Sequence, residues 1–450
     1  MSTGSGNGPN DGPDEGPDEG PGKGQNPFKG TPFEQFFSGA DMSGALSGAM
    51  AGMPDLGQIM GQIQAMMQPH DGALNWAVAE DVARKTVAQS PDPSPTQRQK
   101  DAVADAVRLA DHWLDEATGI PSAVHTTAAW SRAEWIVSTL DVWKGLVEPV
   151  AEQSVKGVGQ ALPPEAQAAA GPIIGILGKA IGAMLANQVG SGLGSLAGEV
   201  LTASDIGLPL STPGLAALVP ANVTAFAEGL DVTEDDVLLY LALREAAHQR
   251  LFAHAPWLRD HLLGAVTDYA RGLEINAEGL QSRMEEQMRG VDPANPESMQ
   301  QLLEGGLFEL PKSPAQQAAL ERLEIALALV EGWVDEVVSQ ATAERMPAAL
   351  RLQEAVRRRR AAGGPAEETF AALVGLELRP RRLRDASTLW GSLRQRQGTE
   401  ARDGVWLSPH LLPTSADLDD PLGFREDAAA PESLTEDDFD AELRKLLDGE

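Results

Sequence analysis

The feature that most limits the fold of this chain is the helical spacing of its apolar residues, which recurs along the sequence from Leu74 onward. Runs such as DAVADAVRLADHWLDEATGI and SRAEWIVSTLDVWKGLVEPVAEQ place apolar residues three or four positions apart. Turn-forming segments, QSPDPSPT and GIPSA, separate these runs. The run ALVPANV, Ala217–Val223, is one of few candidates for a strand, and Pro220 within it indicates an edge position. The pattern predicts a mainly α fold with a small amount of β-strand.

Five tryptophans in the first helical blocks have two interpretations, a ligand platform or core anchors. Large aromatic side chains dominate the energetics of cores, so the core interpretation is favoured for Trp76, Trp113, Trp130, Trp135 and Trp143.

The glycine-rich run from Gly171 to Leu201 also has two interpretations, a membrane span or a soluble helix with a small-residue face. A span needs about 18 or more apolar residues. Lys179 interrupts the run, and Asn187 with Gln188 ends it too early. Close helix packing in a soluble core is therefore favoured.

Charge separates the ends of the chain from its body. The formal net charge is −31, and ten of the excess negative charges lie from Asp417 to Glu450 and four from Met1 to Gly24. We predict a disordered, low-complexity region at 1–68, one domain at 69–424 (parts 69–200, 201–345 and 346–424), and an acidic tail at 425–450. The tail segment Ser433–Glu450 has the apolar spacing of a short amphipathic helix. The first residues lack the apolar core of a secretory signal, so a cytoplasmic location is expected.

Composition excludes several classes of function. The chain has no cysteine, which rules out thiol catalysis and Cys-ligated metals and leaves His and carboxylates as metal ligands. The acidic balance argues against nucleic acid as a partner. The sequence contains no G-x-S-x-G elbow and no phosphate-binding G-x-x-x-x-G-K-[ST] loop.

The string from Leu243 to Phe252, LREAAHQRLF, carries the most specific chemical signal. Zincin proteases use H-E-x-x-H on a helix, where two His ligate zinc and the Glu is the general base. Here Glu245 and His248 have the right spacing, and Arg244 stands where the first His would be. The neighbouring His254 and His261 follow at spacings that do not form an i, i+4 pair with His248.

The surrounding segment, PANVTAFAEGLDVTEDDVLLYLALREAAHQRLFAHAPWLRDHL, resembles the active-site region of a bacterial family of zincin-like, zinc-dependent metalloproteases. Further blocks of that family are resembled, in the same order, by four other segments: RAEWI, ANQVGSGLGSLAGEVL, LVEGWVDEVV and LPTSADLDDPLGF. The resemblance covers about residues 70 to 424. It implies a zincin-like helical core, zinc as cofactor and a peptide or protein as substrate.

The resemblance also implies roles for residues of a later helix. Glu331 and Asp335 are four positions apart and share one helical face. By analogy with thermolysin-like zincins, Glu331 and His248 would be zinc ligands, Glu245 the general base, and Asp335 a support for the ligand at position 244. The alternative is that Glu331 and Asp335 are solvated surface residues.

Arg244 departs from the family pattern in a way that affects the metal directly. A guanidinium keeps its charge in proteins and has no lone pair for zinc. His248 and Glu331 alone would supply two ligands where catalytic zinc usually has three. We therefore expect Arg244 to pair with Glu331 or Asp335, and the metal site to be degenerate, unless His254 or Glu274 fills the gap.

Three functional hypotheses follow: an active zinc metallopeptidase, a catalytically inactive pseudoprotease that binds a peptide or protein, and a helical scaffold whose C-terminal segment recruits partners. The four arginines Arg357–Arg360 have two interpretations, an anion site or a solvated helix face paired with carboxylates. The second is favoured because the chain is acidic. The sequence leaves the oligomeric state open.

Overall fold

The computed structural model describes residues 72–160, 171–272, 313–361 and 382–425. The predictions for residues 1–68, for Glu274 and for the tail beyond Arg425 lie outside these ranges. The described elements are α4 (Trp76–Val87), α5 (Gln97–Leu114), β1 (Thr126–Ala129), α6 (Arg132–Gln160), α8 (Gly171–Glu199), β2 (Leu215–Leu218), α9 (Pro220–Ala227), α10 (Glu234–His254), α11 (Pro256–Arg271), α14 (Pro314–Thr342), α15 (Ala349–Ala361), α17 (Leu383–Gly404), η1 (Val405–Leu407), η2 (Pro409–Leu411) and α18 (Ser415–Asp419). The described part of the chain is mainly α, as the sequence predicts.

Helix α10 is the central helix of the fold. Thr233 caps its N-terminus by accepting a hydrogen bond from the Asp236 N–H, and three acidic residues in the first turn complement the helix dipole. The helix ends before Pro256, which begins α11. Every residue from Tyr240 to Leu251 is buried, which is typical of a helix with neighbours on all sides. Helices α5, α9, α11, α14 and α15 and strand β2 all pack on it.

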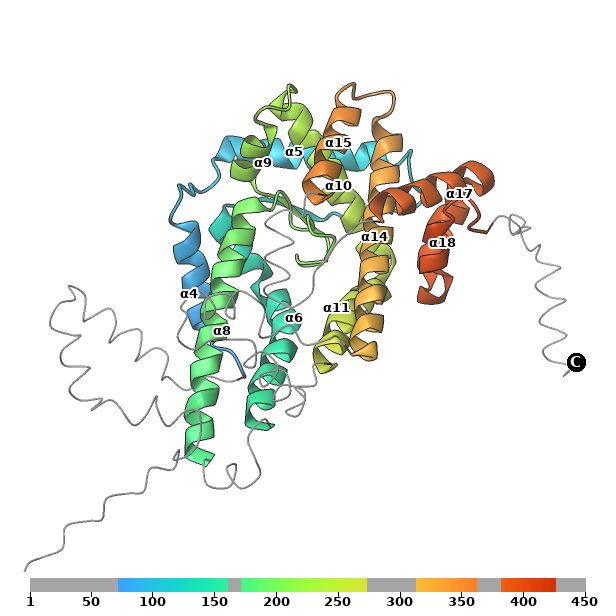
Figure 1. Ribbon diagram of the computed structural model, residues 1–450. Coiled ribbons are helices and arrows are strands. Elements are labelled where there is room, and N and C mark those ends of the chain that lie inside the picture. The colour runs from blue at the N-terminus through green and yellow to red at the C-terminus, as the bar shows by residue number, and fades with distance from the viewer. Residues whose placement is uncertain (1–71, 161–170, 273–312, 362–381, 426–450) are drawn as a thin grey trace, which may run out of the picture. The chain divides into compact units, whose positions relative to one another are not determined.

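Helix α14 runs beside α10, and α15 packs on both (Figure 1). Ser313 and Gln316 form a capping box at the start of α14, and Pro314 occupies its first helical position. On another side, Gly332 lets α17 approach closely: a Cβ at Gly332 would lie 2.5 Å from the Ala386 Cβ. These contacts fix which face of α14 is turned towards α10.

The strand predictions are partly wrong. The strand near the predicted segment Ala217–Val223 is β2, Leu215–Leu218, and Pro220 begins α9 instead of lying in an edge strand. A proline at the first helical position loses no hydrogen bond, so this is a favourable place for it. The partner strand β1, for which the sequence shows no strand pattern, pairs with β2 in parallel, with Thr126 opposite Leu215.

The core confirms the packing interpretations of the tryptophans and the glycine-rich helix. Trp135 and Trp143 are fully buried, and the other three named tryptophans pack in or against the core. Helix α4 lies along α8 (Figure 1). A Cβ at Gly190 or Gly194 would lie within 3 Å of atoms of α4, so both glycines permit this close approach. Within the described ranges, no helix combines the length and apolar character needed to cross a bilayer.

Candidate functional site

Arg244, Glu245 and His248 lie on the buried middle of α10, and Glu331 and Asp335 lie on the buried middle of α14. The side chains of Glu331 and Asp335 are each about 1% exposed. The alternative that these two acids are solvated surface residues is therefore wrong. The packing of α10 on α14 brings one face of each helix together.

Glu331 is held by three positively charged or protonatable side chains. Arg244 Nη2 lies 2.5 Å from its Oε2, and Arg360 Nη1 lies 2.8 Å from the same oxygen. His248 Nε2 lies 3.0 Å from Oε1. Gly207 adjoins Oε1 as well: a Cβ at this glycine would be 3.0 Å from the oxygen. Both oxygens of Glu331 are thus enclosed by protein groups.

His248 is oriented by its own helix. Its Nδ1 lies 2.8 Å from the backbone carbonyl oxygen of Arg244, which can only accept a hydrogen bond, so Nδ1 carries a proton. Its Nε2 is the nitrogen that faces Glu331. A hydrogen bond from Nε2 to an ionised carboxylate needs a second proton on the ring. The ring also stacks on Phe252, with centroids 5.9 Å apart.

The electrostatics of the cluster favour an ionised Glu331. Burial alone would raise the pKa of Glu331, but the positive charges of Arg360, His248 and Arg244 lower that pKa to about 2. Burial disfavours the charge of Arg244 in the same way, yet Glu331 and Asp335 raise its pKa overall. The cluster is a set of mutually compensated charges.

Asp335, which the zincin analogy makes a support for a zinc ligand, is hydrogen-bonded to other side chains here. Arg357 Nη2 and Gln353 Nε2 donate to its Oδ2 from 2.5 and 3.1 Å, and the Ser387 hydroxyl donates from 2.9 Å. Arg244 Nη1 lies further away, 3.9 Å from its Oδ1. Both Glu331 and Asp335 were predicted as possible partners of Arg244, and the closer ion pair is with Glu331.

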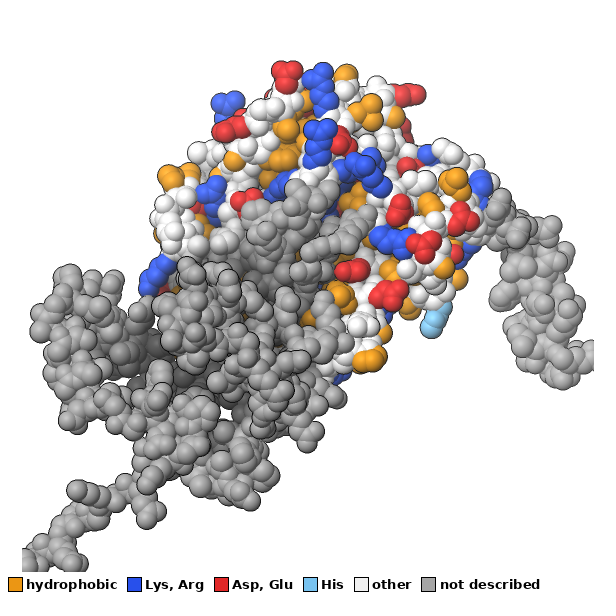
Figure 2. Space-filling view, viewed as in Figure 1, with side chains coloured by type: hydrophobic (Ala, Val, Ile, Leu, Met, Phe, Trp, Pro, Cys, Tyr) orange, Lys and Arg blue, Asp and Glu red, His pale blue; other side chains and the backbone are white. Residues whose placement is uncertain are grey.

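The arginine run on α15 is largely part of this cluster. Arg357 pairs with Asp335, Arg360 with Glu331, and Arg359 with Asp205 at 3.0 Å. Pairing with carboxylates is as expected. The solvated face is not, because Arg357, Arg359 and Arg360 are only 12–25% exposed, whereas Arg358 is 78% exposed. The tertiary packing of α15 on α10 and α14 overrides the usual surface position of arginine. Figure 2 shows basic side chains gathered over the part of this face where Figure 1 places α15.

Asp205 and Arg360 were not anticipated as site residues. Asp205 lies in the segment between α8 and β2, where its Oδ2 accepts from the Leu201 N–H. Burial would raise the pKa of Asp205, but Arg359 and Arg360 lower it. The run of four arginines is the sequence feature that indicates Arg360. No periodic pattern in the sequence indicates Asp205 as a site residue.

Glu245 points to a different part of the interior. Its Oε2 accepts from the Ser204 N–H at 3.0 Å, and its Oε1 accepts from Gln249 Nε2 at 3.0 Å. Burial raises the pKa of Glu245 above its ordinary value. Both carboxyl oxygens therefore have protein partners in the segment that precedes β2 and on α10 itself.

The sequence of residues 74–424 matches the profile of a family described as zincin-like metallopeptidase. The chain belongs to this family. A protein from Chloroflexus aurantiacus, described as a candidate hydrolase with a novel fold, shares the fold with a TM-score of 0.55 and 19% sequence identity. The match covers 79% of this chain and 99% of that one. No curated protein matches the chain.

The residues that the zincin resemblance assigns to zinc are bound to other protein groups in this structure. Zinc needs donors with free lone pairs, usually three from the protein. His248 Nε2 and both oxygens of Glu331 are already in hydrogen bonds, and Arg244 offers no lone pair. In the described part of the chain, no group of three or more His, Asp or Glu side chains is arranged to hold a metal. His254, at the C-terminal end of α10, is not among the cluster's contacts in those ranges.

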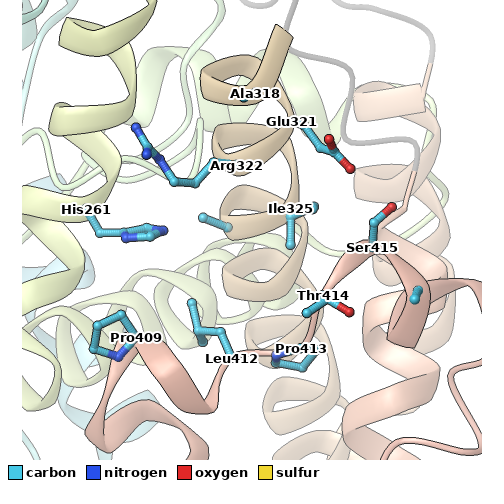
Figure 3. Close-up of a pocket in the computed structure, with 12 residues that line it drawn as sticks. His261, Ala318, Glu321, Arg322, Ile325, Pro409, Leu412, Pro413, Thr414 and Ser415 are labelled. Carbon is cyan, nitrogen blue, oxygen red and sulfur yellow. The ribbon is translucent and has the colours of Figure 1, made fainter. Parts of the chain in front are cut away.

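A separate cavity of about 490 Å³ lies between α11, α14 and the segment around η2. Arg322 of α14 reaches towards His261 of α11, and Leu412 lies below them (Figure 3). Arg322 also pairs with Asp268 at 2.7 Å. The cavity shares no residue with the cluster around Glu331, so it does not expose that cluster.

Proposed function

We propose that this chain is a zincin-like family member with a degenerate metal site, and that it acts as a pseudoprotease that binds a peptide or protein without cleaving it. The observation that carries the proposal is the enclosure of Glu331, whose oxygens are hydrogen-bonded to Arg244 and His248 and form an ion pair with Arg360. The residue in the position of a zinc ligand is fully engaged by charges of the protein itself.

The energetic argument follows from burial. A metal bound to Glu331 would displace the guanidinium groups of Arg244 and Arg360 from their carboxylate, while leaving them in the interior. Removing one partner of a buried ion pair destabilises a protein by about 3–5 kcal/mol, because the remaining charge is uncompensated. A metal with only His248 and Glu331 as protein ligands would have to supply at least that much binding energy.

The binding role is supported by the family. The family is described as zincin-like metallopeptidase, a description that implies peptide or protein substrates, and its model matches residues 74–424 of this chain. We propose that residues 69–424 keep this body as one domain, and that its partner is a peptide or protein. The protein would therefore retain the recognition surface of a peptidase without the chemistry of the metal.

Metal content tests the first part of the proposal. Protein purified without added metal should contain far less than one zinc per chain by elemental analysis, and a chelator should leave its melting temperature unchanged. One zinc per chain that is retained in Arg244→Ala and lost in His248→Ala would instead support the metallopeptidase hypothesis, provided that the protein also cleaves casein and a chelator stops the cleavage.

Peptide binding tests the second part. Fluorescence polarisation with a library of labelled, unstructured peptides should find ligands that bind and remain intact after prolonged incubation. If no peptide binds, and deletion of residues 433–450 removes proteins that co-purify with the full chain, the scaffold hypothesis replaces the pseudoprotease.

A further inference from the structure

Two guanidinium groups from different helices lie close to the same carboxylate oxygen of Glu331. Arg244 reaches Oε2 from α10, and Arg360 reaches it from α15, at 2.5 and 2.8 Å. Only Arg244 stands at a position of the zincin motif. Arg360 is therefore a feature of this site that the motif does not describe.

Arg360 is anchored so that it cannot easily turn away. Its Nη2 also donates to the backbone oxygen of Asp205, and its side chain is only 12% exposed. Arg359 pairs with the carboxylate of Asp205 and so holds the same segment on α15. If Arg244 were removed, Arg360 would still lie on Glu331 with these contacts intact.

The rest of the site has features that suit a metal. The hydrogen bond from His248 Nδ1 to the backbone of Arg244 fixes the ring so that Nε2 faces Glu331. A histidine at position 244, one helical turn before His248, would add a third donor on the same helix face. The scaffold thus keeps the orientation of its donors, while two cations occupy the place of the metal.

We propose that Arg360 is a second, independent barrier to metal binding at this site. Replacing Arg244 with histidine is then insufficient to bind zinc, and removing the charge of Arg360 as well is required. This inference rests on the proposed degenerate site. The physical reason is that a fixed guanidinium 2.8 Å from a ligand oxygen fills the space that a divalent cation would need and repels that cation at short range.

The experiment measures zinc per chain by elemental analysis after equilibrium dialysis, together with the visible absorption of added Co²⁺ as a report of tetrahedral ligation. The variants are Arg244→His, Arg360→Met and the double variant Arg244→His/Arg360→Met. We expect the double variant to bind one zinc per chain at least about a hundredfold more tightly than Arg244→His. Arg360→Met alone should bind no more zinc than the wild type.

The matched control is Arg244→His/Arg358→Met. Arg358 is on the same helix, is 78% exposed and pairs with Glu354, so its loss leaves Glu331 untouched. This control should bind zinc as weakly as Arg244→His alone. Circular dichroism checks folding, and Arg244→His/Arg360→Gln, which keeps a polar side chain at position 360, replaces the methionine variant if that variant is unfolded.

The outcomes separate this inference from the proposed function. Tight zinc binding by Arg244→His alone overturns the role of Arg360 and leaves the degenerate wild-type site standing. A folded double variant that binds no zinc also overturns the inference. One zinc per chain in the wild type overturns the proposed function itself.

Discussion

At the scale of single residues, the cluster depends on Glu331, because one carboxylate compensates several buried cations. Removing its charge leaves Arg244 and Arg360 facing each other without the shared anion. Glu331→Gln should therefore lower the free energy of unfolding by about 3–5 kcal/mol, measured by denaturant titration. The matched control is Glu321→Gln on the exposed face of the same helix, which should change stability by less than about 0.5 kcal/mol. Equal effects of the two substitutions would contradict the role of Glu331.

The low pKa of Glu331 predicts a pH dependence of stability. Its pKa is about 2 in the folded protein and 4.5 ordinarily, so the folded state holds its proton less tightly than the unfolded state. This contribution is fully present above about pH 5 and is lost as the pH falls through 4.5 towards 2. Its size is of the order of 3 kcal/mol. The difference in unfolding free energy between wild type and Glu331→Gln should shrink over this range, and a constant difference would count against it.

Gly207 allows a matched test of how closely the backbone approaches Glu331. Gly207 and Gly229 both have a φ of +77°, but a Cβ at Gly207 would lie 3.0 Å from Oε1 of Glu331, whereas a Cβ at Gly229 meets nothing within 4 Å. Gly229→Ala should cost about 1–2 kcal/mol from the left-handed backbone alone. Gly207→Ala should cost at least about 1 kcal/mol more, because Oε1 must move from its partner His248. Equal losses in thermal unfolding would show that the carboxylate moves freely.

The sequence could predict part of the site at this scale. The spacings that place Glu245 and His248, and then Glu331 and Asp335, on helix faces follow from helical periodicity. Asp205 and Gly207 could not be predicted, because they lie in an irregular segment that tertiary packing brings to the cluster. The positions of arginines on α15 were misjudged for a related reason, since a sequence pattern does not reveal which neighbour covers a charged face.

At the scale of elements, helix boundaries were largely predictable because local chemistry sets them. The Thr233 cap and Pro256 mark the ends of α10, and Pro314 marks the start of α14. Strand β1 was missed because four residues, TTAA, carry too little periodicity, and its pairing with β2 joins segments far apart in the chain.

The α4–α8 pair offers a prediction about elements. A Cβ at Gly194 would lie 2.5 Å from the Thr86 Cβ and 2.8 Å from the Ala83 carbonyl oxygen, so the two helices could not keep their separation. Gly194→Ala should destabilise the protein by about 1–3 kcal/mol. Gly198→Ala, near the end of the same helix, meets nothing within 4 Å and should be neutral or stabilising by up to about 1 kcal/mol. Denaturant midpoints that fall equally in both variants would contradict close packing.

At the scale of the whole molecule, contacts near both ends of the described residues bear on where a folding unit could be cut. At the N-terminal side, the backbone N–H of Ala73 and the indole N–H of Trp76 both donate to Glu148, at 2.5 and 2.8 Å. At the C-terminal side, Arg396 donates to the carbonyl oxygen of Phe424 at 2.8 Å, and the Phe424 side chain is in the core. Residues near the start and the end of the described part of the chain are therefore held by contacts to helices α6 and α17.

These contacts predict that the fragment 69–425 folds by itself. It should unfold in one cooperative calorimetric transition, with a melting temperature within about 3 °C of the full chain. The control fragment, 89–425, lacks α4 and so exposes the glycine face of α8 against which that helix packs. It should unfold at a clearly lower temperature or fail to fold. Two calorimetric transitions in the 69–425 fragment would mean that it contains two domains. A melting temperature far below that of the full chain would mean that residues outside 69–425 contribute to its core.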